Sequence, residues 1–562
     1  MIKKMNKRKL LILTGFAFLT ATRVFAASNE KGIEYYRADL YGAAKIFFLQ
    51  QTNQSPAEQA ENYYYLGQTY YQLNQEDSAS YYYRKAIELF PDYPFGYVGE
   101  GMLQLKNRNA KAAEDLFKKA NNLAKKDPSV QTSIAEVYVL VGDYENVKTA
   151  LDKARKINNK FSGIYIAEGD MLMKQGKTGE ACGRYENAIL FNSTDKVAYL
   201  KLAQVYKEIN TSVALQNLDK LVTIDRNYIP AYAVYGDIYR EEGKYKDALD
   251  AYEKFIAIPG VPLLQHERYA QLLFFTGQFE KALEQIKYVI SNDPNNLVMK
   301  RLEAYNSYRL ENYAAGLEQM NRFLAEMPKE RHIYQDYMYL GQLALKEKRL
   351  TEALDAFQKA LEIDSTQPEI YKEMATAALN ANLYSEAIKY YEKYLAMDPS
   401  ADAMDYYSYA QANYFAAVYY ILPENEASPA LETTEYAVFK NNVQKGDNAF
   451  AEVIKRKPEL HYGYLGRANI NSLLDKYEID KTGKMTGYAK PFFEEALPFL
   501  LNTNSDGSKN RLIIEAYRYL ANYYLSVENN TAAVGEYNKK ILDVDPNDEA
   551  ARKTLQLLKI KY

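Results

Sequence analysis

Few side chains in this sequence belong to the types that usually carry catalysis or bind metals. The chain has 562 residues, with a single cysteine and three histidines, at positions 266, 332 and 461. One cysteine excludes a disulfide framework and any zinc or iron–sulfur site built from several thiolates. Cys182 lies between Ala181 and Gly183, which favours a small buried residue over a nucleophile. His332 and His461 have no Ser, Cys or acidic partner placed to activate them.

A calcium loop is the remaining candidate for an ion site. Residues 478–483, with the sequence Glu-Ile-Asp-Lys-Thr-Gly, faintly resemble one. Such a loop needs a bidentate Glu six residues after its glycine, and Ala489 occupies that position. Glycine patterns typical of phosphate or dinucleotide binding are also missing. The sequence therefore predicts no catalytic residue, metal site or cofactor, and it gives no reason to expect an enzyme.

The first 26 residues have the pattern of an export signal. Five basic residues from Lys3 to Lys9 precede an apolar stretch from Leu10 to Ala21. Val24-Phe25-Ala26 then offers small residues at the usual cleavage spacing. The apolar stretch has about twelve residues, against roughly 20 for a membrane span, so an uncleaved anchor is the less favoured alternative. We expect a mature chain that begins near Ala27, has no transmembrane span, and is periplasmic, envelope-associated or secreted.

Processing would also change the charge of the protein. The whole chain has 70 Lys and Arg against 73 Asp and Glu, a formal charge of −3. Residues 1–26 contain six basic and no acidic residues, so the charge of the mature chain would be −9. An acidic chain lacks the basic field that supplies most nonspecific affinity for nucleic acids. We therefore expect no nucleic-acid partner.

Small residues recur about every 34 positions over most of the chain. They are Gly32, Gly67, Gly101, Ala135, Gly169, Ala203, Gly236, Ala270, Ala304, Gly341, Ala375, Ala410, Gly466 and Ala521. Twelve positions later a second small residue usually follows, and four after that a large apolar or aromatic one, as at Ala79 and Tyr83. These columns predict two antiparallel helices per repeat, which small residues allow to approach and the large side chain packs between.

Each helix pair cannot bury its apolar face alone, so the pairs must stack into an all-α solenoid. No segment shows the sustained two-residue alternation of a β-strand. Aspartate–proline pairs at positions 127, 293, 398 and 545 match helix starts, with Asp as the cap and Pro in the first turn.

The columns resemble the tetratricopeptide repeat. The motif Tyr63-x-x-Leu66-Gly67-x-x-Tyr70, followed by Ala79, Tyr83, Ala86 and Pro91, is a close match, and similar motifs begin at Tyr232 and Tyr337. The resemblance covers essentially the whole mature chain and implies a right-handed superhelical solenoid. In this family tryptophan often occupies the column where this chain has Tyr63, Tyr232 and Tyr337. Much of the unusual composition, 55 Tyr and no Trp, is therefore a packing substitution.

The spacing divides the chain into four segments. We expect a signal peptide at 1–26, repeats 1–11 at 27–402, two expanded repeats at 403–513, and the last repeat with a capping helix at 514–562. The expanded repeats contain insertions at 423–435 and 475–489. Such insertions are often functional in repeat proteins, although harmless longer loops are equally possible.

The resemblance also implies that the first helix of each pair lines a concave groove. The predicted partner-binding residues are Tyr64, Gln68, Tyr71, Met102, Asp170, Asp237, Arg240, Gln271, Arg301, Tyr305, Tyr308, Gln342, Tyr407, Gln411 and Tyr414. The Lys and Asn set with which the family's best-known members bind a peptide carboxylate is missing. Tyr, Met and Arg are instead types enriched in the cores of protein interfaces.

We therefore expect a non-enzymatic scaffold of the cell envelope that binds segments of other proteins or peptides along this groove. Two alternatives stay open. The same tyrosines could stack on sugar rings in a glycan-binding protein, or they could simply close the superhelix on itself. The sequence does not determine the oligomeric state, nor whether the groove or the convex face binds.

Overall fold

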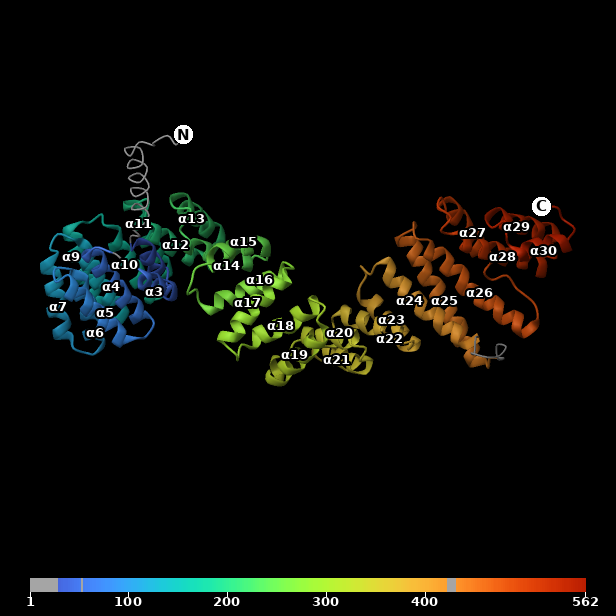
Figure 1. Cartoon of the computed structure of the whole chain (residues 1–562), viewed down its shortest axis with the longest axis horizontal. Coiled ribbons are helices and arrows are strands. Elements are labelled where there is room, and N and C mark those ends of the chain that lie inside the picture. Colours follow the sequence, from blue (N-terminus) through green and yellow to red (C-terminus); the bar gives the residue numbers. More distant parts are fainter. Residues whose placement is uncertain (1–28, 52–53, 422–430) are drawn as a thin grey trace, which may run out of the picture. The chain divides into compact units, whose positions relative to one another are not determined.

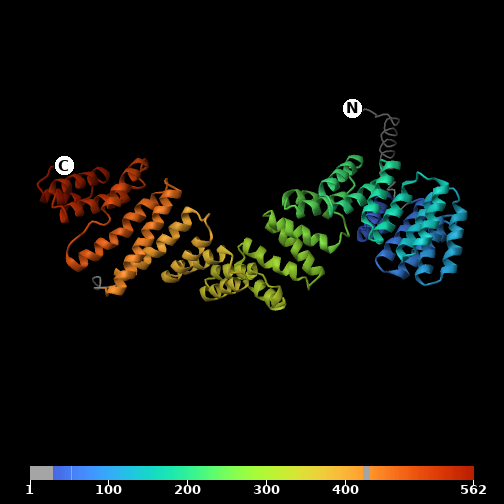
Figure 2. The same ribbon diagram turned by 180° about the vertical axis from the view of Figure 1, so that it is seen from behind.

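The computed structural model describes residues 29–51, 54–421 and 431–562. Within these ranges the chain forms α-helices, one short 3-10 helix and turns, with no β-strand. The expected all-α solenoid of stacked helix pairs is confirmed (Figures 1 and 2). The predicted leader at 1–26 and most of the predicted insertion at 423–435 lie outside the described residues.

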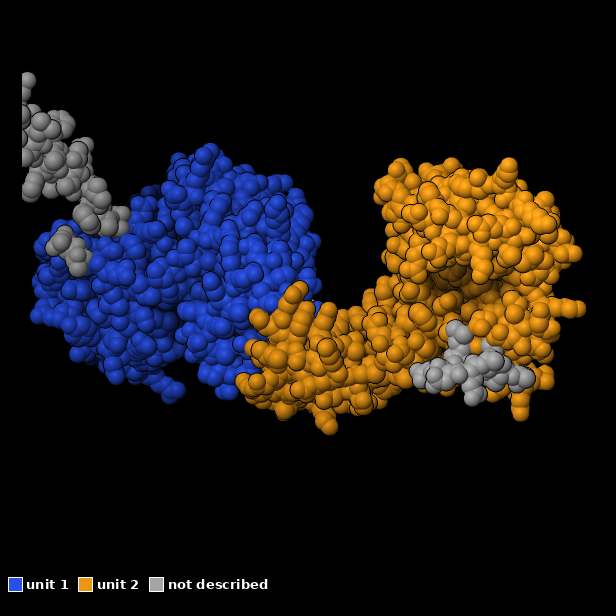
Figure 3. All heavy atoms as spheres, turned by 45° about the vertical axis from the view of Figure 1, so that its right-hand side comes forward, with its two compact units in different colours: residues 1–310 blue, residues 311–562 orange. Residues whose placement is uncertain are grey.

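Contacts divide the chain into two compact units, residues 1–310 and 311–562, which we call unit 1 and unit 2 (Figure 3). The boundaries expected at residues 402 and 513 mark changes in repeat length and stay predictions. The helices of unit 1 are α2 (Glu30–Arg37), α3 (Tyr41–Gln50), α4 (Pro56–Gln72), α5 (Glu76–Leu89), α6 (Pro94–Lys106), α7 (Ala110–Leu123), α8 (Pro128–Val141), α9 (Tyr144–Ile157), α10 (Ser162–Lys174), α11 (Thr178–Phe191), α12 (Lys196–Lys207), α13 (Thr211–Ile224), α14 (Pro230–Glu241), α15 (Tyr245–Ile256), α16 (Leu263–Phe275), α17 (Phe279–Asn292) and α18 (Leu297–Arg309).

Unit 2 continues the same pattern with longer helices in its middle. Its elements are α19 (Tyr313–Glu326), the 3-10 helix η1 (Lys329–Arg331), α20 (Tyr334–Lys346), α21 (Leu350–Ile363), α22 (Pro368–Asn380), α23 (Tyr384–Met397), α24 (Ala403–Ile421), α25 (Thr433–Arg456), α26 (His461–Thr482), α27 (Lys490–Asn502), α28 (Asn510–Ser526), α29 (Thr531–Val544) and α30 (Glu549–Leu557).

The small-residue column packs directly against the large residue sixteen positions later. A Cβ atom added to Gly101 of α6 would lie 2.5 Å from Cε1 of Phe117 in α7. Gly67, Gly169, Gly236 and Gly341 meet Tyr83, Tyr185, Tyr252 and Phe357 in the same way. Where the column has Ala135, Ala270 or Ala304, the position sixteen later is instead aliphatic: Leu151, Ile286 and Met320. At these positions the volume lost on one helix is gained on the other, as close packing requires, whereas Ala375 and Ala521 have Tyr391 and Tyr537 sixteen positions later.

Most helix pairs turn through one residue with a left-handed backbone. In several turns that residue is a glycine, as at Gly142 and Gly176. In others it is a polar residue: Asp39, Asn74, Arg108, Glu311, Lys348 and Asn382 have φ between 59° and 62°. The turn therefore requires the conformation and not one particular side chain.

Three of the four aspartate–proline pairs are not helix starts, which corrects the prediction. Only Pro128 begins a helix, with Asp127 accepting the backbone N–H of Ser129. Asp293, Asp398 and Asp545 instead lie at the end of the preceding helix. Each of these three accepts the backbone N–H two residues later. They form local Asx turns, and the next helix begins two or more residues beyond the proline.

The insertion predicted at 475–489 is only partly a loop. Helix α26 continues to Thr482, and the chain leaves it through Gly483 with φ 73°. The segment after Gly483 then runs back past the buried Asp475. The Asp475 carboxylate accepts hydrogen bonds from the backbone N–H groups of Tyr488 and Ala489 in this segment. These contacts give the segment a structural role, because a carboxylate with several N–H donors is strongly stabilised.

The first helix pair folds back against the far side of unit 1. Gly42 of α3 touches the backbone of Gly260, so closely that neither residue could have a side chain there. Tyr35, Ala44 and Phe48 belong to the same buried apolar cluster as residues of α12–α18. Unit 1 is therefore a closed superhelical turn, with α2 and α3 packed against helices about 200 residues later in the chain.

An ionic cluster secures this closure. The ammonium of Lys196, at the start of α12, contacts Glu34 and Glu30 of α2 and lies 3.1 Å from Asp225 Oδ2. Burial alone would lower the pKa of Lys196, but the hydrogen bonds to Glu34 and Asp225 outweigh it and raise the pKa. The first helix is thus fixed by charge as well as by apolar packing.

The glycine column can be tested with a pair of alanine substitutions. Alanine is favoured over glycine in a helix by about 1 kcal/mol, but in Gly101→Ala the added methyl would meet Phe117. We expect this variant to lose about 1–3 kcal/mol of unfolding free energy, measured by urea denaturation. Gly183→Ala, where nothing lies within 4 Å, should instead be neutral or stabilised. Adding Phe117→Leu should reduce the loss of unfolding free energy caused by Gly101→Ala. If Gly101→Ala and Gly183→Ala changed the unfolding free energy equally, this packing would be contradicted.

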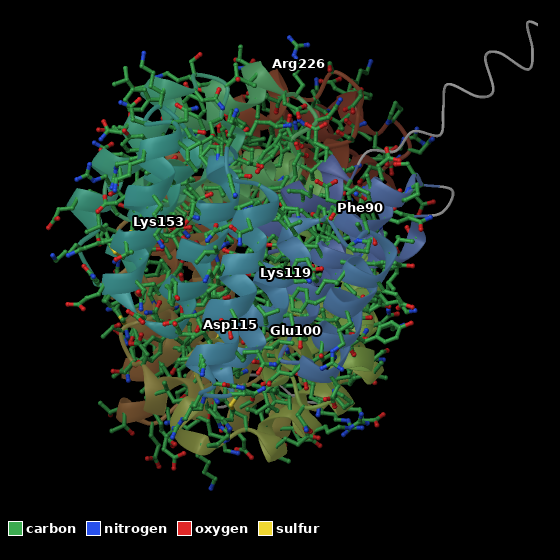
Figure 4. The ribbon with its side chains drawn as sticks, turned by 90° about the vertical axis from the view of Figure 1, so that its left-hand side faces the viewer. Phe90, Glu100, Asp115, Lys119, Lys153 and Arg226 are labelled. Carbon is green, nitrogen blue, oxygen red and sulfur yellow. The ribbon has the colours of Figure 1, made fainter. Side chains whose placement is uncertain are left out.

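The closure can be tested at Lys196. In Lys196→Gln the carboxylates around it lose their cation, so α2 should detach more readily. We expect amide hydrogen exchange in residues 30–37 to accelerate by about 10-fold, equivalent to about 1.4 kcal/mol. Lys153→Gln is the control, because Lys153 is exposed on the outer face of unit 1 (Figure 4). Unchanged exchange in α2 would show that the ionic cluster does not hold it.

Candidate functional site

The structure separates the predicted groove residues into two groups. Partly exposed are Tyr71, Asp170, Asp237, Arg240, Gln271, Arg301, Tyr308, Gln342, Tyr407, Gln411 and Tyr414. Buried are Tyr64, Gln68, Met102 and Tyr305. The second group cannot offer a free surface to a partner, which corrects that part of the prediction.

The physical reason is clearest at α4. The Tyr64 ring packs against Tyr93 and Phe95 of the next repeat, with ring centroids 6.3 and 5.5 Å away. Gln68 accepts a hydrogen bond from the Tyr36 hydroxyl of α2 at 3.3 Å. Neighbouring repeats therefore use these groove positions for packing. The alternative that the groove tyrosines close the superhelix on itself stays a prediction.

A cavity of about 790 Å³ remains inside unit 1, which we call the unit 1 cavity. One wall consists of first helices α8, α10 and α12, which contribute Glu136, Asp170 and Lys201. The opposite wall is the corner between α2 and α3, including Tyr36, Arg37, Asp39 and Tyr41. Its volume lies within the range of typical ligand pockets.

The charged groups of the unit 1 cavity form a network. Arg37 Nη1 lies 2.6 Å from Glu136 Oε1, and Lys201 Nζ lies 2.9 Å from Asp170 Oδ1. Coulombic attraction to Glu136 raises the pKa of Arg37. Burial would lower the pKa of Lys201, but Asp170 outweighs this effect and the pKa is raised. Both cations therefore stay charged at any physiological pH.

Two tyrosine hydroxyls donate to carboxylates of the same network. The Tyr185 hydroxyl donates to Asp170 Oδ1 at 2.8 Å, and the Tyr41 hydroxyl donates to Asp39 Oδ1 at 2.5 Å. Burial first, and then the neighbouring carboxylate, raise the pKa of both tyrosines. The hydroxyls thus remain protonated and orient the two carboxylates.

An apolar strip borders the charged network. Leu140, Met173 and Ile209 line the cavity and have exposed fractions of 41%, 37% and 60%. They lie at, or just beyond, the C-terminal ends of α8, α10 and α12. The cavity therefore combines polar groups with apolar side chains that remain accessible.

Several other predicted groove residues already have partners within the chain. Asp237 accepts from the Tyr252 hydroxyl at 2.6 Å and from Arg268 Nη1 at 2.7 Å. In unit 2, Gln342 donates to Glu373 and Gln411 donates to the Tyr407 hydroxyl. These side chains shape the inner face of the array, and a ligand would have to compete for them.

The sequence-based prediction missed residues of two kinds. Glu136 directly follows the column residue Ala135, just as Asp170 follows Gly169, so the same spacing identifies it. Arg37, Asp39 and Tyr41 lie in and around a turn, and their place in the cavity depends on the closure of unit 1. The spacing of residues along the chain does not show that unit 1 closes, so it could not predict that these three residues line the cavity.

The cysteine and the histidines contact ordinary packing partners. Cys182 is buried, and burial raises the pKa of its thiol. The His266 ring packs 4.5 Å from that of Tyr288, and His332 is hydrogen-bonded to Tyr337 and to the carbonyl of Met327. Burial and Lys509 lower the pKa of His461. No group of three or more potential metal ligands occurs among the described residues.

Among the described helices, none is both long and apolar enough to cross a membrane. The outer face of unit 1 is strongly charged, with Asp115, Lys119 and Lys153 on the second helices of their pairs (Figure 4). The accessible apolar side chains discussed above therefore line the cavity on the opposite, inner side of these helix pairs.

Comparisons with known proteins found relatives that match parts of this chain. The human protein O-mannosyl-transferase TMTC1 is 21% identical over 206 residues, 36% of this chain, and this chain spans only 23% of its length. The chicken DnaJ homolog subfamily C member 3 is 22% identical over 405 residues, which cover 62% of this chain and 79% of that protein. A crystal structure of the C-terminal part of a repeat protein from Cytophaga hutchinsonii is 23% identical and covers 51% of this chain and 99% of its own, with a TM-score of 0.39.

Family models identify the repeats directly. Four models, each described as the tetratricopeptide repeat, match residues 60–93, 229–259, 301–368 and 344–413. The matches fall in both units and include three of the helix pairs with glycine–ring packing, those of Gly67, Gly236 and Gly341. This chain is a tetratricopeptide repeat protein.

Proposed function

We propose that this protein is a non-enzymatic scaffold that binds short extended segments of other proteins inside the unit 1 cavity. The observation that carries the proposal is the cavity itself: about 790 Å³, with an accessible apolar strip beside a hydrogen-bonded charge network. Tetratricopeptide repeats generally serve protein–protein interaction. The partly exposed inner face of unit 2, around Tyr407, Gln411 and Tyr414, is a second, weaker candidate surface.

Glycan binding has less support. The Tyr36 and Tyr41 rings pack against each other with centroids 5.7 Å apart, and the Tyr41 and Tyr185 hydroxyls are occupied by Asp39 and Asp170. A sugar ring needs an open aromatic face on which to stack. Catalysis also has little support, because Cys182 is buried and the histidines are engaged in packing.

The proposed site of action is the cell envelope. The basic head, the apolar stretch and the small residues before Ala27 support export. An exported acidic scaffold would meet proteins of the envelope as its partners.

Export can be tested by sequencing the N-terminus of the protein from its native cells. We expect the exported protein to begin at Ala27. Replacing Leu11 and Leu13 with Arg should abolish processing, because charges in the apolar stretch prevent recognition as a signal. Recovery of the intact N-terminus in a membrane fraction would support the anchor alternative instead.

Partner binding can be tested by site-specific photo-crosslinking in intact cells. A benzoylphenylalanine in place of Met173 would face the unit 1 cavity, whereas one in place of Lys153 would face outward (Figure 4). We expect the probe at position 173 to yield a defined adduct, which mass spectrometry maps to one segment of a partner protein. The probe at position 153 should not yield that adduct. If only position 153 did, the convex face would be the binding surface.

A further inference from the structure

We propose that the unit 1 cavity selects a basic side chain, Lys or Arg, carried next to apolar residues of an extended segment. This inference rests on the proposed function and adds the chemistry of the ligand. It follows from the charge balance of the cavity, from the accessibility of one carboxylate and from the place of the apolar strip.

Carboxylates outnumber cations in the cavity. Glu136, Asp170 and Asp39 face only Arg37 and Lys201. At the rim, Lys174 and Glu208 add one charge of each sign, so the lining as a whole has a formal charge of −1. A cationic group would balance this charge, whereas an acidic group would increase the repulsion.

Asp39 is the carboxylate available to that ligand. Glu136 and Asp170 each have a cation within 3 Å, but among the ion pairs of the described residues none involves Asp39. Asp39 is exposed, and among the hydrogen bonds of the described residues its side chain accepts only that of the Tyr41 hydroxyl. A carboxylate has about four acceptor positions, so most of those on Asp39 remain open to an ammonium or guanidinium donor.

The fold does not need an aspartate at this position. Asp39 has the left-handed conformation of the α2–α3 turn, and the equivalent turns use Asn74, Asn382 and Lys348 with the same φ. The carboxylate is therefore not required for the turn, and its charge can be changed without changing the backbone.

The remaining lining matches the rest of such a ligand. The half-buried Tyr36 and Tyr41 also line the cavity, beside Asp39 in the α2–α3 corner. Leu140, Met173 and Ile209 are the accessible apolar contacts for the neighbouring residues of the segment. Together they predict a pattern of one basic residue next to apolar residues.

The test is a selection of binders from a random library of displayed decapeptides, with the full chain as bait. We expect enriched peptides to contain Lys or Arg next to apolar residues, and their affinity to fall with increasing salt. For one enriched peptide, fluorescence anisotropy should show affinity about two- to five-fold lower for Asp39→Asn, the range for an exposed charge pair. Asp39→Lys should lower the affinity more than Asp39→Asn does. A selection repeated with Asp39→Lys as bait should enrich acidic peptides.

The matched control is Glu311→Gln, which removes the same charge from an equivalent exposed turn position in unit 2. It should leave the affinity unchanged, and all variants should have wild-type thermal transitions. Enriched peptides without a preference for basic residues would overturn this inference while leaving segment binding intact. If Asp39→Asn and Glu311→Gln changed the peptide affinity equally, Asp39 would not be part of the binding site. If no peptide is enriched, the proposed function fails, and this inference fails with it.

Discussion

The contact between a small residue of one helix and a large side chain of its partner is the constraint on which the rest of the structure depends. It sets how closely the helices of a pair approach. In several repeats a glycine packs against an aromatic ring, and at Ala135, Ala270 and Ala304 an alanine stands opposite an aliphatic side chain. Tyr185 links this packing to the candidate site. Its ring fills the space beside Gly169, and its hydroxyl reaches Asp170 in the unit 1 cavity.

Closure of the first superhelical turn is the second determining feature. Because α2 and α3 fold against α12–α15, groove positions that would face solvent in an open array become interior. The closure brings Arg37, Asp39 and Tyr41 to the wall opposite α8, α10 and α12, and Gln68 accepts a hydrogen bond from Tyr36 of α2. The closure therefore brings two walls together around a partly open cavity, in which electrostatic contacts are stronger than in bulk water.

Much of the architecture could be predicted because it is periodic. The columns at Gly67, Gly101 and Gly169 predicted the helix pairs and their contacts, and the structure has them. Local signals were less reliable. At Asp293 the aspartate–proline pair predicted a helix start, but the carboxylate instead accepts a nearby N–H in a turn. About half of the insertion near Asp475 extends a helix, and Asp475 accepts hydrogen bonds from the chain that returns after it.

The sequence alone determined the repeat, the all-α class, the first-helix positions and the scarcity of catalytic groups, since all of these follow from residue types at fixed spacing. Tertiary structure alone decided which inner positions are accessible and which charges meet. Arg37 and Glu136 are 99 residues apart in the chain, and Lys196 is 162 residues from Glu34. Such contacts depend on the curvature summed over many repeats, where small differences in each helix crossing accumulate, and no local pattern encodes that sum.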